Sequence, residues 1–238
     1  MTRWELPETH ALVETAFGAA QLKLARESIR SLVDREHYAS YHFREASRLT
    51  KDFERRHLKD GFLLEIYTQQ GERKRLAFEQ YIIKASAHAV ASVQSIHALP
   101  DILANAIYLA SGRNLLPNSL AEHEIALPSV VSALTTDTNF CSLAPLLTKA
   151  QSGSHWRHLA ALTNLSKHRS VVRASLNEDL TGLRANHREL HFQSFERKAR
   201  YFPAISVQSL LEPEFLRLAT LIVEVGHELN VCLRRIAV

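Results

Sequence analysis

Turn-forming residues are scarce in this sequence, and their scarcity limits the possible folds more than any other feature. The 238 residues include only 7 Gly and 7 Pro. A chain with so few turn formers has long elements and few connections, which favours helices over a many-stranded sandwich or barrel. Apolar residues make up 46% of the chain, enough to bury a core. We therefore predict a mainly α protein, an antiparallel helical bundle that forms a single domain over residues 1–238.

The spacing of apolar residues predicts the early helices. From Glu8 to Val33 apolar side chains fall three or four apart, which predicts a long first helix, and a polar, aromatic second helix is expected over 35–59. After Gly71 the steps of one, three or four predict a third helix with one buried stripe. The residues of this stripe are Phe78, Tyr81, Ile82, Ala85, Ala89, Val93 and Ile96.

Prolines predict the starts of later helices, because Pro suits the first turn of a helix. Pro100 is expected to open a short helix that ends at Gly112, Pro128 to open another, and Pro213 to open the last; a further helix is predicted from near His155. The last helix has a strict three-four repeat over three heptads, so it packs along another helix, within the fold or across a dimer. The repeat consists of Phe215, Leu218, Ile222, Val225, Leu229, Cys232 and Ile236.

Residues 190–207 differ from the rest, because apolar and aromatic side chains there partly alternate with polar ones. This pattern predicts a small β-hairpin inserted before the last helix, with residues 196–199 as its turn. An irregular loop packed by aromatic side chains is the alternative. The basic and His-rich segment 184–191 before it is predicted to be a solvated connection.

Several classes of protein are excluded by what the sequence lacks. No apolar run reaches the roughly 18 to 20 uncharged residues of a membrane span, and the N-terminus shows no apolar signal-peptide core. We therefore expect a cytoplasmic protein with no membrane association. Cys141 and Cys232 lie too far apart for a zinc motif, and Gly-rich phosphate loops and Gly-x-Ser-x-Gly are absent. No cofactor and no bound metal are expected, and kinase, nucleotide-hydrolase and esterase activities lose their support.

The segment 156–169 is the most informative in the chain. Four of its residues share one face at helical spacing: Arg157, Ala161, Asn164 and His168. Lys167 and Arg169 flank that face with positive charge. An imidazole can move a proton near neutral pH while neighbouring cations stabilise the charge on a phosphate. The net charge of +4 permits a nucleic-acid partner without requiring one.

The stretch Leu162–Arg169 on a late helix, after an antiparallel bundle, resembles the HEPN superfamily of helical proteins, which are often tied to RNA cleavage and phage defence. The resemblance covers roughly residues 72–236. Active members carry an Arg, four to six residues and then a His, and cut RNA without metal at a site formed across a dimer. His168 matches that His, and Asn164 resembles the polar residue of the motif. The nearest upstream Arg is Arg157, eleven residues earlier, roughly 16 Å away along a helix.

The resemblance implies a homodimer that binds RNA or a nucleotide, or a metal-independent endoribonuclease, in a stress, phage-defence or toxin-antitoxin setting. His168 and Asn164 would be the catalytic residues, with His168 as acid or base on the ribose 2′-hydroxyl. The residues implied to bind phosphate or RNA are Lys167, Arg169, Arg157 and Arg173.

Two alternatives remain open at the level of sequence. Asn164 and His168 could satisfy buried hydrogen bonds or cap a helix end, with Lys167 and Arg169 solvated, because cations at a helix C-terminus complement its dipole. The chain could also be a non-catalytic helical protein-interaction or dimerisation module that associates through its last helix.

Overall fold

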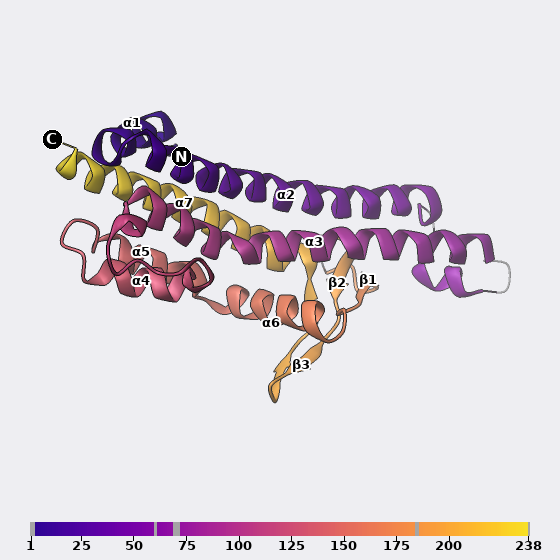
Figure 1. Ribbon diagram of the computed structural model, residues 1–238. Helices are drawn as coiled ribbons and strands as arrows, with labels where there is room; N and C mark the ends of the chain where they lie inside the picture. Colours follow the sequence, from indigo (N-terminus) through magenta and orange to yellow (C-terminus); the bar gives the residue numbers. More distant parts are fainter. Residues whose placement is uncertain (1–2, 60, 69–71, 184–185, 238) are drawn as a thin grey trace. The chain divides into compact units, whose positions relative to one another are not determined.

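The computed structural model describes residues 3–59, 61–68, 72–183 and 186–237, and these residues form a mainly α fold with short antiparallel strands, as predicted (Figure 1). The α-helices are α1 (Leu6–Phe17), α2 (Ala19–His57), α3 (Glu72–Ala110), α4 (Leu127–Thr135), α5 (Leu143–Thr148), α6 (Ser154–His168) and α7 (Val207–Ile236). Short 3-10 turns are η1 (Leu63–Tyr67), η2 (Arg113–Leu115), η3 (Glu122–Glu124) and η4 (Lys149–Gln151). None of the described helices combines the length and apolarity needed to cross a lipid bilayer.

The chain divides into two compact units, each assembled from separate segments. The first unit consists of residues 1–37, 98–154 and 215–238, and the second of residues 38–97 and 155–214. Helices α2, α3 and α7 each contribute one part to each unit. The single domain expected from the sequence stays a prediction.

In the first unit, the three-four repeat of α7 faces the core. Leu218, Val225 and Leu229 are buried within the chain, so the repeat packs inside the fold and not across a dimer interface. A buried polar chain joins the N-terminal segment to the same helix: the Trp4 indole donates to Thr9 Oγ1 (2.8 Å), which donates to Asn230 Oδ1 (2.7 Å). This network fixes α1 against α7.

In the second unit, small residues bring α2 and α3 close together. Most of the predicted stripe of α3 is buried, including Ala85 and Ala89, and Ala46 is buried on α2. Further along, the rings of Phe53 and Tyr81 stack with their centroids 4.6 Å apart. Packing of one apolar stripe against another is what the spacing in α3 predicted.

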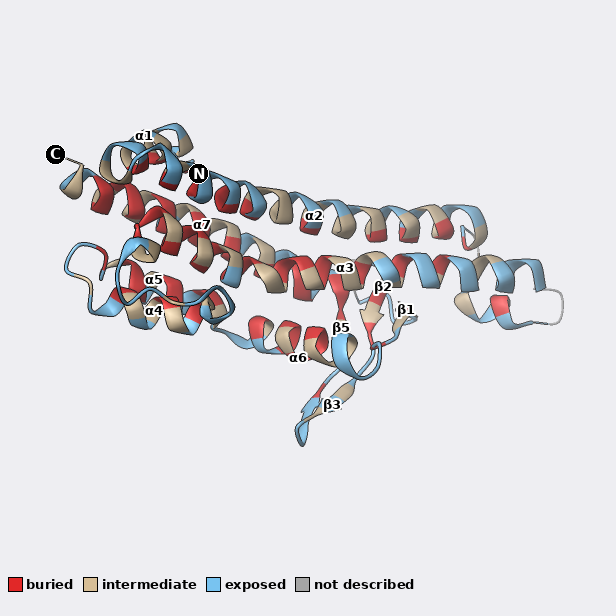
Figure 2. Ribbon diagram, viewed as in Figure 1, coloured by how far each residue is buried: buried red, intermediate tan, exposed pale blue. Residues whose placement is uncertain are grey.

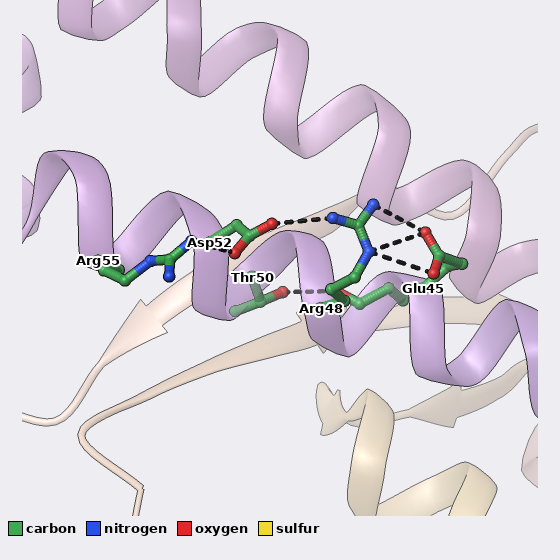
Figure 3. Close-up of polar contacts among 6 residues, drawn as sticks. Glu45, Arg48, Thr50, Asp52 and Arg55 are labelled. Carbon is green, nitrogen blue, oxygen red and sulfur yellow. Dashed lines mark hydrogen bonds and ion pairs between the residues drawn. The ribbon is translucent and has the colours of Figure 1, made fainter.

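The opposite, solvated face of α2 carries a chain of ion pairs at helical spacing. Figure 3 shows Arg48 between Glu45 and Asp52, with Nη2 2.8 Å from the Glu45 carboxylate and Nη1 2.8 Å from the Asp52 carboxylate. Arg55 continues the chain to Asp52 at 2.9 Å. Pairs three and four residues apart favour an exposed helix, and they explain why this polar stretch stays helical.

The second unit also contains every strand of the described residues. These are β1 (Ala174–Glu178), β2 (Arg188–Phe192), β3 (Phe195–Arg197), β4 (Arg200–Phe202) and β5 (Ile205–Ser206). Three form an antiparallel sheet in the order β1-β2-β5, in which buried Leu176 lies opposite buried Leu190. Strands β3 and β4 form the predicted hairpin, which is confirmed. Its turn is narrower than predicted, with Lys198 and Ala199 alone between the strands, and β1 was not predicted at all.

Three helix boundaries predicted from the sequence are wrong. The first break falls at Gly18, which has φ +85°, and α2 then continues without interruption through the predicted gap near residue 34. Pro100 lies inside α3 and Pro213 inside α7, which begins at Val207. Pro in a helix interior loses a hydrogen bond at a cost of about 3 kcal/mol. At Pro100 the chain is buried on α3, so packing offsets that cost.

The prediction of a solvated connection over 184–191 is also wrong where the structure describes it; residues 184–185 lie outside the described residues. Arg188 begins β2, and its guanidinium is paired with Glu178 of β1, both side chains being at least nine-tenths buried. The same guanidinium donates to the carbonyls of Leu58 (3.1 Å) and Gly61 (2.6 Å). An arginine that looks like a surface charge in the sequence therefore joins the sheet to the end of α2.

Candidate functional site

The end of α6 presents the basic residues singled out in the sequence. Lys167 and His168 are the last two residues of the helix, Arg169 follows, and all three side chains are exposed. Figure 2 shows the C-terminal end of α6 and the start of the segment that follows it in the colour of exposed residues. The amide of Arg169 donates to the Leu165 carbonyl (2.9 Å), so the turn that carries these side chains is closed by a main-chain hydrogen bond.

The chain that leaves α6 is fixed at its far end by the sheet. Val172 is buried, and the carbonyl of Arg173 accepts a hydrogen bond from the Gln193 amide (3.0 Å). The side chain of Arg173 remains exposed. Residues 167–173, called the basic segment below, therefore run between two ordered elements with their cations directed to solvent.

The cations of the basic segment lack acidic partners among the residues that the structure describes. Among the described residues, no carboxylate forms an ion pair with Lys167, Arg169 or Arg173. The reason is visible in the sequence, where residues 138–177 contain five Lys or Arg and no Asp or Glu. This acid-free run indicates an anion-binding surface more directly than the Asn-His spacing does.

Asn164 and Arg157 lie apart from this group. The Asn164 amide donates to the Ala160 carbonyl of its own helix (2.8 Å), and the side chain is half-buried. Arg157 is exposed, but Ala161, between it and His168 on the same face, is buried. Eleven residues of helix separate Arg157 from His168 by about 16 Å. A phosphate that contacts His168 therefore cannot contact Arg157 of the same chain as well.

An aromatic cluster fixes the β3–β4 hairpin to α6. The rings of Phe195 and Phe202 stack with centroids 4.9 Å apart, and both meet the His158 ring edge-on, at 5.5 and 5.4 Å. His158 is buried, its Nε2 has no hydrogen-bond partner among the described residues, and burial lowers the pKa of this imidazole. His158 is therefore a packing residue that positions the hairpin beside the helix that carries the basic segment.

A pocket of about 380 Å³ lies in the second unit among α2, β2 and the start of α7. The Glu54 carboxylate is in its wall, with Oε1 buried and without a hydrogen-bond partner in the described chain. Burial raises the pKa of Glu54, although Arg188, His187 and Lys51 oppose the shift. The volume is that of a small-molecule site, and nothing in the sequence had indicated it.

In the described part of the chain no three His, Cys, Asp or Glu side chains gather where they could hold a metal ion. Comparison with protein-family models, with curated proteins and with solved structures found no match to this chain.

Proposed function

We propose that this protein binds single-stranded RNA through the phosphates, at the basic segment, as a HEPN-like helical protein of stress or phage-defence systems. The proposal depends on one observation: Lys167, His168, Arg169 and Arg173 are exposed, and within the described chain no carboxylate neutralises them. Cations that are free of acidic partners release counterions from a nucleic acid when they meet its phosphates, and this release drives binding. Exposed cations that are already paired with acidic side chains would gain far less binding free energy from phosphates.

Cleavage of the bound RNA is the second part of the proposal. The imidazole of His168 takes the proton of a ribose 2′-hydroxyl as that oxygen attacks the neighbouring phosphorus. The bond from phosphorus to the 5′-oxygen breaks, and this oxygen takes a proton from water. The products are a 2′,3′-cyclic phosphate and a 5′-hydroxyl end, while Lys167 and Arg169 stabilise the charge on the phosphorane oxygens. No Arg stands four to six residues before His168, so cleavage in this proposal depends on His168 and the two cations beside it.

Binding is tested with a labelled, unstructured RNA and the variant K167Q/R169Q, by fluorescence anisotropy over a range of salt concentrations. We expect the variant to bind at least about 10-fold more weakly at low salt, with a dependence of log Kd on log salt that is less steep by about 1.4, because two phosphate contacts are lost. The control K23Q/R26Q removes the same charge from exposed positions on α2 and should bind like the wild type. Equal losses in both variants, or no binding by the wild type, would rule out this site.

Cleavage is tested by incubating the same RNA with protein in the presence of a chelator and analysing the ends of the products. His168→Ala should abolish the cyclic-phosphate products and leave RNA binding within about twofold, because the side chain is exposed and its loss does not disturb the core. His123→Ala, another exposed histidine, should cut like the wild type. A protein that binds RNA and cuts nothing would remove the catalytic half of the proposal alone.

A further inference from the structure

The β3–β4 hairpin carries two arginines directly opposite each other. In the register of the two strands Arg197 pairs with Arg200, and the next pair along is Glu196 with Tyr201. Side chains alternate across a strand, so the two arginines lie on the same face as Phe195 and Phe202, and Glu196 lies on the other. Like charges in facing positions, roughly 5 Å apart at Cβ, destabilise a hairpin.

Nothing in the described chain compensates for this repulsion. Neither Arg197 nor Arg200 forms an ion pair with a described carboxylate, and Arg197 is half-buried. The Arg200 guanidinium lies 5.5 Å from the centre of the Phe202 ring, which orients it without neutralising it. Two guanidinium groups therefore share one face of the hairpin with no internal counter-charge.

The turn that joins the strands adds a third cation and further strain. Lys198 has φ +51° and Ala199 φ +56°, so both are left-handed although neither is Gly. A tight turn of this kind is favourable with Asn-Gly, and other residues cost of order 1 kcal/mol each there. The hairpin is formed nevertheless, because Phe195 and Phe202 pack on His158 of α6. The left-handed turn and the facing arginines thus both destabilise the tip of the hairpin.

We infer that the facing pair Arg197 and Arg200 is a phosphate-binding site, and that in the function proposed above, on which this second step rests, it binds a backbone phosphate of the RNA. Each guanidinium presents planar N–H groups that match two phosphate oxygens, and one phosphate between the pair would replace the repulsion by attraction on both sides. Tyr201, which is 62% exposed, belongs to the next pair along the hairpin, and its side chain lies on the face opposite the two arginines.

The hairpin and the basic segment are both attached to α6. His158, which contacts the hairpin, and Lys167 and His168 lie on the one helix α6, so the arginine pair and the basic segment belong to the same unit. In Figure 1 the hairpin extends away from the three-stranded sheet as a narrow arm. An RNA that reaches both places contacts more phosphates than the basic segment alone provides.

The experiment compares the wild type with R197Q/R200Q, with K23Q/R26Q as the control of equal charge. The first arm uses inorganic pyrophosphate, and its readouts are the melting temperature and the NMR signals of the arginine side chains. Without anion, R197Q/R200Q should melt at the same temperature as the wild type or higher, since repulsion has been removed. Pyrophosphate should raise the melting temperature of the wild type and the control, and should shift the Arg197 and Arg200 signals. It should have no such effect on R197Q/R200Q.

The second arm measures binding of the unstructured RNA over a range of salt concentrations. R197Q/R200Q should bind several-fold more weakly than the control, with a salt dependence less steep by about 0.7 for the one phosphate that is lost. An unchanged pyrophosphate response in R197Q/R200Q would overturn the arginine site. Normal RNA binding by R197Q/R200Q, with a loss in K167Q/R169Q, would overturn its role in RNA recognition and leave the proposed function standing. Pyrophosphate binding at the pair without any RNA binding by the wild type would overturn the proposed function and leave the anion site standing.

Discussion

Burial in the folded protein makes the carboxyl group of Glu36, on α2, a weaker acid. Burial raises the pKa of Glu36 from 4.5 to about 7. The folded protein therefore keeps a proton on this group at pH values where the unfolded chain has lost it. The stability that this proton supports is complete below pH 4.5 and is lost as the pH rises through 7.

Glu36→Gln should remove this dependence, because the amide keeps the shape of the protonated acid and never ionises. We expect no change in the free energy of unfolding at pH 4, and a gain on the order of 1–2 kcal/mol at pH 8, after allowance for the partly exposed side chain. Urea denaturation at the two pH values measures this difference. Glu27→Gln, at an exposed position on the same helix, is the control and should change little. A variant no more stable than the wild type at pH 8 would refute the explanation.

At the scale of elements, the buried ion pair of β1 and β2 joins three parts of the second unit. Glu178 accepts hydrogen bonds from Arg188 (2.7 Å) and from the amide of Leu63 in η1 (2.9 Å). Arg188 also donates to two carbonyls that follow α2. Each nitrogen of this guanidinium has a main-chain or carboxylate oxygen as partner, so removal of the side chain takes away hydrogen bonds from Glu178 and from both carbonyls.

Arg188→Ala should therefore destabilise the protein by about 3 kcal/mol or more, as the loss of one partner from a buried ion pair generally does. The free energy of unfolding from chemical denaturation gives the value. The matched control is Arg55→Ala, which breaks a pair whose arginine is 70% exposed and should cost no more than about 0.5 kcal/mol. Similar losses of unfolding free energy in the two variants would mean that the buried pair with Glu178 stabilises the protein no more than an exposed pair does.

At the scale of the whole molecule, residues from near both ends of the chain close the first unit. Trp4 packs against Gly226 of α7 so closely that a Cβ atom on this glycine would overlap the indole ring. The backbone of Gly226 is helical, so its use is to leave room for the ring rather than to permit a special φ. Gly lowers the stability of the helix itself, but burial of the Trp4 side chain against it offsets this cost.

Gly226→Ala should destabilise the protein by about 1–3 kcal/mol, because displacing the Trp4 ring outweighs the gain of about 1 kcal/mol in helix propensity. In the Trp4→Ala background the same change should be neutral or stabilising, since the obstacle is gone. Thermal or urea denaturation of the four proteins of this cycle measures the coupling. Equal effects of Gly226→Ala in the two backgrounds would show that the ring does not set the identity of this residue.

Most of the helices and the hairpin could be predicted because their signals are local. The stripe of α3 and the repeat of α7 are periodic patterns that only a one-sided helix satisfies, and the alternation near Phe195 and Phe202 indicates strands. The basic residues of the candidate site were predicted from equally local features, because charged side chains at the end of a helix, such as Lys167, are generally exposed. The arginine pair of the hairpin was missed, because its members become neighbours only when the strands pair in register.

The sequence by itself determined that this protein is mainly helical, where its apolar stripes run and that a basic segment lacks acids, because spacing and composition act over a few residues. Only the tertiary structure decided that α3 and α7 continue through Pro100 and Pro213, that Arg188 is buried and that Arg197 faces Arg200. Burial of Pro100, and the contacts of Arg188 with segments far away in the sequence, outweigh the local preferences of these two residues. Arg197 meets Arg200 only through the register in which the two strands of the hairpin pair.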